Sequence, residues 1–314
     1  MDQNAAELNH LISLLWSFAL TGLLICAIIV FIIYLVNKKI YLKSEYFAQT
    51  KSPYLSVRFD KGKLGEYYTY KYLRPLKGCR KYLFNCYIPK SDGTTTEIDV
   101  IMLHETGVYV FESKNYSGWI FGSENQQTWT QTLPTGKGRS QKLHFLNPII
   151  QNKVHIKWLQ EYLGENIQLP IYSYIVFSDR CTLKSITLTS GNHHVINRYN
   201  ILSAVTANAA SVGSVLSEEQ INELYDKLHP LTQADEAVKI SHINNIAQKH
   251  FTNKSVPSIG PIPSIPTERI CPRCGSKMVL RTASKGANAG KQFWGCEHFP
   301  KCRYIENIKY NYPS

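Results

Sequence analysis

The first 37 residues of the chain contain no lysine or arginine, and the stretch from Leu11 to Val36 contains no charged residue at all. A cleavable signal peptide has a basic segment before a shorter apolar core, so both absences argue against one. The 26 uncharged residues exceed the about 20 that a helix needs to cross the hydrocarbon core of a membrane. They predict one transmembrane helix rather than a buried core helix. Nothing in it indicates a channel, because it holds no ionisable group.

The residues on either side of this helix predict its orientation. Asp2 and Glu7 precede it, whereas Lys38, Lys39 and Lys43 follow it. Because lysine and arginine stay on the cytoplasmic side, we expect the N-terminus outside and the rest of the chain in the cytoplasm. The sequence therefore predicts a single-pass protein of the inner (cytoplasmic) membrane.

Acidic residues are comparatively few, with 23 against 35 lysines and arginines and a formal net charge of +12. A basic chain favours polyanionic partners, either nucleic acid or an anionic membrane surface, and charge alone does not choose between them. The length of 314 residues leaves room for two soluble modules.

Hydrophobic periodicity in the middle of the chain predicts an α/β domain. The expected helices are 60–73, 147–163 and 216–231, and the expected strands are 80–89, 96–104, 107–115 and 171–179. In the second strand we expect Ile98, Val100 and Met102 to share one face.

Two of these strands carry acidic residues at matching positions. A four-residue turn at 104–107 would place Asp99 opposite Glu112 and Glu97 opposite Lys114. Two facing carboxylates repel each other unless a cation lies between them, which favours a Mg²⁺ or Mn²⁺ site. The alternative is a solvated strand face with a Glu97–Lys114 surface ion pair.

The pattern D-x12-E-x-K on a hairpin that follows a helix resembles the PD-(D/E)xK nuclease superfamily and its nuclease-related domain (NERD) branch. The segments that carry the resemblance are KGKLGEYY at 61–68, TEIDVIML at 96–103, GVYVFESKNYSGWIFG at 107–122, NPIIQNKVHIKWLQEYL at 147–163 and IYSYIVFSD at 171–179. The resemblance implies a restriction-endonuclease-like mixed sheet flanked by helices.

The resemblance also implies roles for individual residues. Asp99 and Glu112 would bind a catalytic Mg²⁺ or Mn²⁺, Lys114 would be the catalytic lysine, Glu66 would point into the site and Gln151 would border it. The reaction implied is phosphodiester hydrolysis by a metal-activated water.

Several neighbouring residues depart from the pattern or carry weaker signals. Ile98 stands where the superfamily's name has proline, and we expect His155, His193 and His194 to be structural or exposed. A segment with aromatic and basic residues is either a mobile surface loop or a contact for nucleic acid; it contains Trp119, Trp129, Lys137 and Arg139.

Four proline residues at 255–268 predict an extended linker. The predicted segments are an N-terminal tail and transmembrane helix with its basic flank at 1–44, a nuclease-like domain at 45–235, a helix remnant and linker at 236–268, and a zinc ribbon at 269–314.

Four of the eight cysteines lie in the last 44 residues with the spacing C-x2-C-x21-C-x5-C; they are Cys271, Cys274, Cys296 and Cys302. Two close pairs are typical of a structural zinc site, which would supply much of the folding free energy of so small a segment. A disulfide framework is the alternative in an exported protein. His298 lies between the second pair, but four thiolates already complete the ligand set.

CPRCGSKMVLR, FWGC and FPKCRY closely resemble the four-cysteine zinc finger at the C-terminus of bacterial type IA topoisomerases, which implies binding to single-stranded DNA. From residue 269 onward there are nine basic and two acidic residues. Aromatic rings stack on bases and cations contact phosphates, so the candidate DNA-binding residues are Lys291, Phe293, Trp294, Phe299, Lys301, Arg303 and Tyr304. The chain has no room for the toroidal domains of a complete topoisomerase.

The sequence therefore predicts a membrane-anchored, metal-dependent nuclease with a DNA-binding zinc ribbon. The alternative is a non-catalytic, membrane-tethered DNA-binding or scaffold protein that uses a nuclease-like fold. Attachment to lipid by charge alone would explain neither the acidic hairpin nor the cysteines.

Overall fold

The computed structural model describes residues 2–136, 138–164, 169–235, 237–242, 271–282 and 292–307. The contacts divide the chain into two compact units, Met1–Phe251 and Thr252–Ser314. The predicted linker lies outside the described residues from position 243 onward, so its extended form and the four segment boundaries stay predictions.

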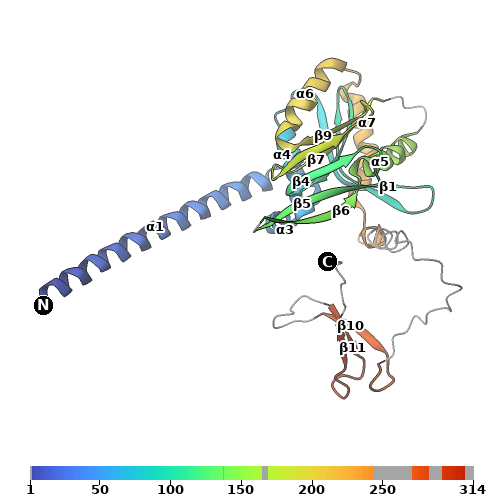
Figure 1. Ribbon diagram of the computed structural model, residues 1–314. Coiled ribbons are helices and arrows are strands. Elements are labelled where there is room, and N and C mark those ends of the chain that lie inside the picture. The colour runs from blue at the N-terminus through green and yellow to red at the C-terminus, as the bar shows by residue number, and fades with distance from the viewer. Residues whose placement is uncertain are drawn as a thin grey trace. The chain divides into compact units, whose positions relative to one another are not determined.

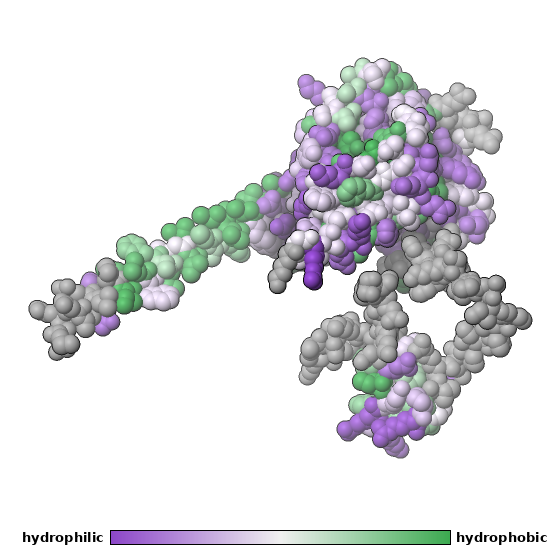
Figure 2. All heavy atoms as spheres, viewed as in Figure 1, coloured by the Kyte–Doolittle hydropathy of each residue, from purple (hydrophilic) through white to green (hydrophobic). Residues whose placement is uncertain are grey.

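The first unit begins with a long helix, α1 (Asp2–Leu42), and three shorter ones, α2 (Glu45–Thr50), α3 (Tyr54–Phe59) and α4 (Lys61–Leu73). Among the described residues, Ile12–Leu42 of α1 is the one stretch of helix long and apolar enough to cross a membrane. Apolar side chains cover the exposed surface of this helix, as Figure 2 shows in green. Its last turns join the folded unit, because Tyr41 is fully buried and donates a hydrogen bond to the Ser52 carbonyl.

A mixed five-stranded sheet forms the centre of this unit, in the order β1-β2-β3-β7-β9 (Figure 1). Its strands are β1 (Arg80–Pro89), β2 (Thr95–His104), β3 (Gly107–Lys114), β7 (Ile171–Phe177) and β9 (His193–Asn197). The first three strands are antiparallel, whereas β3, β7 and β9 are parallel. The α/β fold with a mixed sheet flanked by helices is thus confirmed.

Helices cover both faces of the central sheet. On one face, α4 and α6 (Ile201–Val212) pack on a core that is rich in aromatic side chains. On the other face, α5 (Pro148–Leu163) and α7 (Glu218–Leu228) pack on aliphatic side chains. Two short 3₁₀ helices, Arg198–Asn200 and His229–Gln233, follow β9 and α7.

The segment after the acidic hairpin forms a second sheet. Its strands have the order β6-β5-β4-β8 and are β4 (Gly118–Ser123), β5 (Thr128–Gly136), β6 (Arg139–Leu146) and β8 (Cys181–Thr187). The interpretation of this segment as a loop is therefore wrong. Trp129 is fully buried, and a Cβ atom at Gly122 would lie 2.2 Å from its ring, so this tryptophan is a core residue. Trp119 and Arg139 remain exposed, and Lys137 lies outside the described residues.

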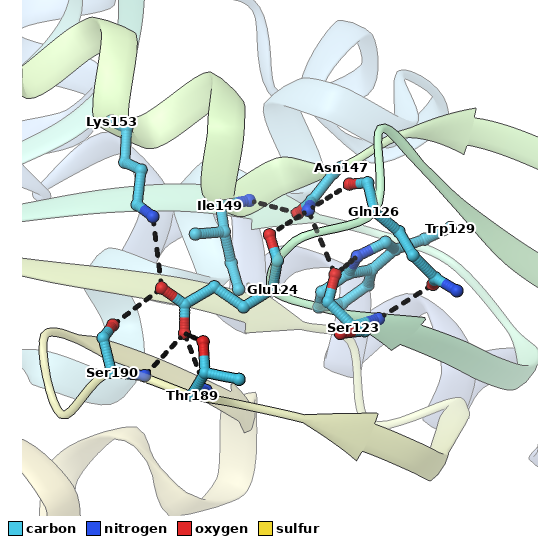
Figure 3. Close-up of polar contacts among 9 residues, drawn as sticks. All are labelled: Ser123, Glu124, Gln126, Trp129, Asn147, Ile149, Lys153, Thr189 and Ser190. Carbon is cyan, nitrogen blue, oxygen red and sulfur yellow. Dashed lines mark hydrogen bonds and ion pairs between the residues drawn. The ribbon is translucent and has the colours of Figure 1, made fainter.

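A buried carboxylate ties this second sheet to α5 and to the turn before β9, as Figure 3 shows. Glu124 accepts hydrogen bonds from the backbone and hydroxyl groups of Thr189 and Ser190 and lies 3.1 Å from Lys153 Nζ. The Asn147 amide donates to the carbonyls of residues 123, 124 and 126, while its oxygen caps α5 at Ile149 N. These contacts fix the start of the helix that carries Gln151 and His155.

Replacing Glu124 with alanine is expected to lower the free energy of unfolding by about 2–4 kcal/mol, because four hydrogen bonds to a buried carboxylate are lost. The donors of Ser190 and Thr189, with Lys153, hold the pKa of Glu124 well below its ordinary value. A carboxylate with a depressed pKa stabilises the fold above its unfolded pKa of about 4.3, and this contribution is lost as the pH falls further. The loss should therefore be full at neutral pH and shrink in acid.

Urea unfolding of the full chain, followed by tryptophan fluorescence, measures this effect. Glu161→Ala, which removes an exposed glutamate from α5, is the matched control and should change little. A Glu124→Ala variant as stable as the wild type at pH 7 would contradict the structural role.

The second unit is a small antiparallel ribbon of β10 (Met278–Thr282), β11 (Gln292–Cys296) and β12 (Ile305–Asn307). Its core consists of the buried side chains of Cys271, Met278, Cys296 and Cys302, against which Trp294 and Tyr304 are partly buried. So few apolar residues make a very small core, which favours stabilisation by a metal.

Candidate functional site

The predicted register of the acidic hairpin is confirmed where β2 and β3 pair, from His104↔Gly107 to Val100↔Phe111. The backbone ladder ends there. Beyond it, Asp99 Oδ2 accepts a hydrogen bond from the Ser113 backbone N–H at 2.8 Å. The side chain of Asp99 thus replaces the next ladder bond and is held beside the end of β3.

An irregularity in β1 and β2 changes which way the side chains near Asp99 face. Phe84 and Val100 belong to the core under α4, whereas Cys86 and Ile98 belong to the core under α5. The expectation that Ile98 and Val100 share one face is therefore wrong. The change of face occurs at Asn85, which adopts a positive φ of 51° and lies between the paired residues opposite Asp99.

Glu112 lies between a lysine and a histidine. Its Oε1 is 2.6 Å from Lys114 Nζ, and its Oε2 is 3.1 Å from His155 Nε2. His155 Nδ1 in turn lies 2.7 Å from the Thr96 hydroxyl. Glu112 is buried and Lys114 is largely buried. His155 is thus part of the cluster, although sequence reasoning assigned it a structural or exposed position.

Glu66 reaches the cluster from α4. Its Oε2 accepts a hydrogen bond from Tyr46 at 2.8 Å. The helix approaches the sheet closely at Gly65, where a Cβ atom would lie 2.8 Å from Ser113 Oγ. This close packing explains why glycine stands at position 65, and it brings Glu66 near Asp99.

The carboxylates perturb one another. Burial and the charges of neighbouring carboxylates raise the pKa of Asp99 to about 7 and that of Glu66 to about 8. Burial acts in the same direction on Glu112, but Lys114 and His155 outweigh it and lower the pKa of this carboxyl to about 2. Lys114 has a raised pKa, because the two carboxylates outweigh its desolvation.

Two predicted neighbours make no direct contact with Asp99 or Glu112 among the described contacts, although the charge of Glu97 acts on Asp99 and Glu66. Glu97 accepts a hydrogen bond from Tyr87 and lies 3.8 Å from His242 Nε2, and Lys114 pairs with Glu112 instead. Gln151 is half-buried on α5, one turn before His155. Among the described contacts, its side chain makes no hydrogen bond to the acidic cluster.

A cavity of about 600 Å³ opens beside the cluster. Glu66 and Glu97 line it together with Lys51 and Lys63. Carboxylates flanked by lysines suit a ligand that carries both phosphate groups and a bound cation.

The acidic cluster suits Mg²⁺ or Mn²⁺. The raised pKa values of Asp99 and Glu66 indicate negative charge that a divalent cation would compensate. Among the described residues, Asp99 and Glu112 belong to no group of three His, Cys, Asp or Glu side chains whose ligand atoms all lie within 4.8 Å of one another. Two carboxylates are nonetheless sufficient, because Mg²⁺ keeps several waters and binds substrate oxygens.

The ribbon contains a zinc-binding site. The Sγ atoms of Cys271, Cys274, Cys296 and Cys302 all lie within 4.8 Å of one another, and two pairs are separated by 3.7 and 3.3 Å. A tetrahedron of thiolates around zinc, with Zn–S of about 2.3 Å, has edges of about 3.8 Å. Gly275, with a φ of 72°, forms the turn after the first pair. His298 instead contacts Ser276 Oγ through Nδ1.

The candidate DNA-binding residues of the ribbon differ in exposure. Phe299, Lys301 and Arg303 are exposed, whereas Phe293, Trp294 and Tyr304 are half-buried. Lys291 lies outside the described residues. Arg281, which sequence reasoning did not select, lies over the Phe299 ring at 5.9 Å and extends the basic surface.

Comparison with known proteins agrees with this architecture. The nuclease-related domain family matches residues 61–178, and the topoisomerase DNA binding C4 zinc finger family matches residues 268–311. An uncharacterized protein of Bacillus anthracis is 35% identical over 190 residues, which cover 60% of this chain and 85% of that protein. The chain belongs to the nuclease-related domain family.

The ribbon has a relative of its own. DNA topoisomerase 1 of Methanocaldococcus jannaschii is 46% identical over 41 residues, which cover 13% of this chain and 5% of the topoisomerase. No solved structure matches the chain.

Proposed function

We propose that this protein is a membrane-anchored, divalent-metal-dependent nuclease that hydrolyses phosphodiester bonds of DNA. The observation that carries the proposal is the meeting of Asp99, Glu112 and Lys114 at the end of one hairpin, with Lys114 Nζ 2.6 Å from Glu112 Oε1. A carboxylate pair beside a buried lysine offers both a metal site and a fixed positive charge.

Each side chain of the cluster has a separate role in the proposed hydrolysis. Asp99 and Glu112 would hold the Mg²⁺ or Mn²⁺ ion, which would supply an activated water and a positive charge for the phosphate. Lys114 orients the attacking water and offsets the charge that develops on the phosphate oxygens. Glu66 and Gln151 border the substrate, and His155 holds Glu112 in position.

The remaining parts of the chain bring substrate and site together. The zinc ribbon, which resembles a DNA-binding finger, binds DNA, preferentially single-stranded, and raises its concentration near the catalytic unit. The apolar helix α1 anchors the chain in the inner membrane, with its N-terminus outside and its lysine-flanked end in the cytoplasm.

Cleavage assays test the proposal directly. The full chain, purified in detergent with zinc, is incubated with single- and double-stranded DNA and RNA in Mg²⁺, Mn²⁺ or EDTA. Cleavage of DNA that requires the divalent ion supports the proposal. DNA binding without cleavage under every condition overturns it.

One observation favours the alternative, a non-catalytic DNA-binding or scaffold protein. Both oxygens of Glu112 already have partners, Lys114 and His155, so an incoming ion must displace or share one of them. Under this alternative the pairs simply stabilise the buried carboxylate, and the ribbon is the functional element.

His155 offers a further prediction within the proposed function. Replacing it with alanine is expected to lower kcat by about 10–100-fold and to raise the Mg²⁺ concentration needed for half-maximal rate, because Glu112 loses a partner that orients it. Titration of the cleavage rate with Mg²⁺ measures both effects. His144→Ala, on the exposed strand β6, is the control, and equal Mg²⁺ dependence in both variants would contradict a positioning role.

A further inference from the structure

A second, basic cavity lies at the carboxyl ends of the parallel strands β3 and β7. Its volume is about 440 Å³, and four cationic side chains line it: Arg58, Lys71, Arg180 and Arg198. Crevices beyond the carboxyl ends of parallel strands are common binding sites in α/β proteins. The excess of positive charge indicates an anionic ligand.

Arg198 is the most unusual of the four cations. Its side chain is only 3% exposed, and its Nε and Nη2 atoms have no hydrogen-bond partner among the described residues. The guanidinium lies 5.6 Å from the Tyr68 ring centroid, which compensates only part of the charge. A buried guanidinium stays protonated and is costly without an anion.

The one carboxylate that lines the cavity, Asp179, is hydrogen-bonded to other groups, and its charge acts on Arg198 without a direct ion pair. Asp179 accepts hydrogen bonds from the Tyr72 hydroxyl and the Tyr199 backbone N–H. Within the described part of the chain, Arg198 has no ion pair with any carboxylate. The buried positive charge of Arg198 therefore favours an oxyanion such as a phosphate in the cavity that this residue lines.

The cavity adjoins the acidic cluster. Asn115, which lines the cavity, directly follows Lys114, and Arg180 Nη2 donates to both its backbone and side-chain oxygens. Helix α4 also links the two, because Gly65 precedes Glu66 and a Cβ atom at Gly65 would lie 3.8 Å from Arg198 Nη2. A polynucleotide that crosses the end of β3 would reach both places.

We propose that this cavity binds a second backbone phosphate of the nucleic acid, apart from the phosphate that is cleaved. The inference rests on the proposed function for the identity of the substrate, and it specifies a polynucleotide rather than a single nucleotide. Arg198 receives the phosphate, and Arg58 and Lys71 add long-range attraction.

An anionic lipid headgroup carries the same phosphate chemistry. Arg58 and Lys71 also line a groove of about 380 Å³ against Val30 and Ile33 of α1, next to the apolar stretch. The nucleic acid is favoured because Asn115 and Arg180 place the cavity at the carboxyl end of the strand that carries Lys114.

Binding measured without cleavage tests the proposal independently of catalysis. Fluorescence anisotropy of a labelled 20-nucleotide single strand is recorded with the full chain in neutral detergent and EDTA over a range of salt concentrations. The variants are Arg198→Met, Arg198→Lys and Arg58→Met. Arg58 is exposed, so Arg58→Met tests the cavity even if replacing the buried Arg198 unfolds the protein. Arg74→Met, an exposed arginine at the end of α4 outside the cavity, is the control.

We expect Arg198→Met to weaken binding about tenfold and to reduce the slope of log K against log salt by about 0.7, the loss of one phosphate contact on a single strand. Arg58→Met should reduce both quantities less, and Arg74→Met should change neither. Unchanged affinity and slope in Arg198→Met and Arg58→Met overturn the inference. Loss of co-purifying phosphatidylglycerol, measured by mass spectrometry, with unchanged DNA binding assigns the cavity to lipid and also overturns it.

The same variants separate this inference from the proposed function. If the wild type does not cleave DNA but the Arg198 variants bind it more weakly, the nuclease proposal fails and the phosphate site stands. If the wild type cleaves and the Arg198 and Arg58 variants match it in KM and salt dependence, the nuclease proposal stands and the phosphate site fails.

Discussion

Replacing Glu112 with glutamine is expected to lower the rate of metal-dependent DNA cleavage by at least about 10³-fold, or roughly 4 kcal/mol of transition-state stabilisation. Glutamine keeps the size of the side chain but loses the charge that binds the ion and pairs with Lys114 at 2.6 Å. Lys114→Met should cause a loss of similar size, because it removes the cation beside the phosphate.

Single-turnover cleavage of labelled DNA at saturating Mg²⁺ measures these losses without contributions from product release. Glu161→Gln, an exposed glutamate on α5, is the matched control and should retain the wild-type rate. Because the two residues act as a unit, the double variant should be little slower than either single variant. A Glu112→Gln variant that cleaves as fast as the wild type would place catalysis elsewhere.

DNA affinity must be compared alongside the rate. The Glu112→Gln variant is expected to bind DNA as tightly as the wild type in EDTA, since the ribbon and the basic cavity are untouched. A parallel loss of binding and cleavage would point to unfolding. Loss of cleavage with unchanged binding shows that Glu112 acts in the chemical step. The scaffold alternative, in contrast, expects DNA binding without cleavage.

The hairpin illustrates what local sequence can predict. Alternation of apolar residues and a four-residue turn were sufficient to predict the register from Leu103↔Val108 to Val100↔Phe111. Register follows from local pattern because a one-residue shift would move the whole apolar set to the other face.

The same pattern failed at Ile98, because the change of face depends on the positive φ of Asn85 in the neighbouring strand. No pattern within 96–104 reports the backbone conformation of residue 85. A signal was nevertheless present, since asparagine adopts positive φ more readily than most residues. The position of Asn85 opposite Asp99 follows only from the pairing of β1 with β2.

Long-range contacts account for the other differences. His155 meets Glu112 across 43 positions of sequence, so its role follows from the packing of α5 and not from any local spacing. Trp129 was interpreted as a surface residue in a loop, but three strands and the close contact at Gly122 bury it. Arg198 belongs to no motif, and its burial, with Nε and Nη2 lacking hydrogen-bond partners among the described residues, appears only in the folded chain.

The zinc ligands were predictable from spacing alone, because a segment with so small a core needs the metal in order to fold. We therefore expect the double variant Cys296→Ser, Cys302→Ser to lose the ribbon structure entirely. Structural zinc contributes about 10–16 kcal/mol in small fingers, far more than the four buried side chains among the described residues of this unit supply. Cys26→Ser, an exposed cysteine in α1, is the control and should leave the ribbon intact.

Hydrogen exchange of segments 271–282 and 292–307, with zinc content by atomic absorption, measures this loss in the full chain. Affinity for single-stranded DNA should fall about 100-fold, because the ribbon no longer holds the strand near the first unit. Cleavage of DNA at saturating concentration should be nearly unchanged, since the proposed catalytic residues lie in the first unit. If the double variant instead loses the chemical step while keeping its DNA affinity, the ribbon belongs to the catalytic site and the division of labour proposed for the two units is wrong.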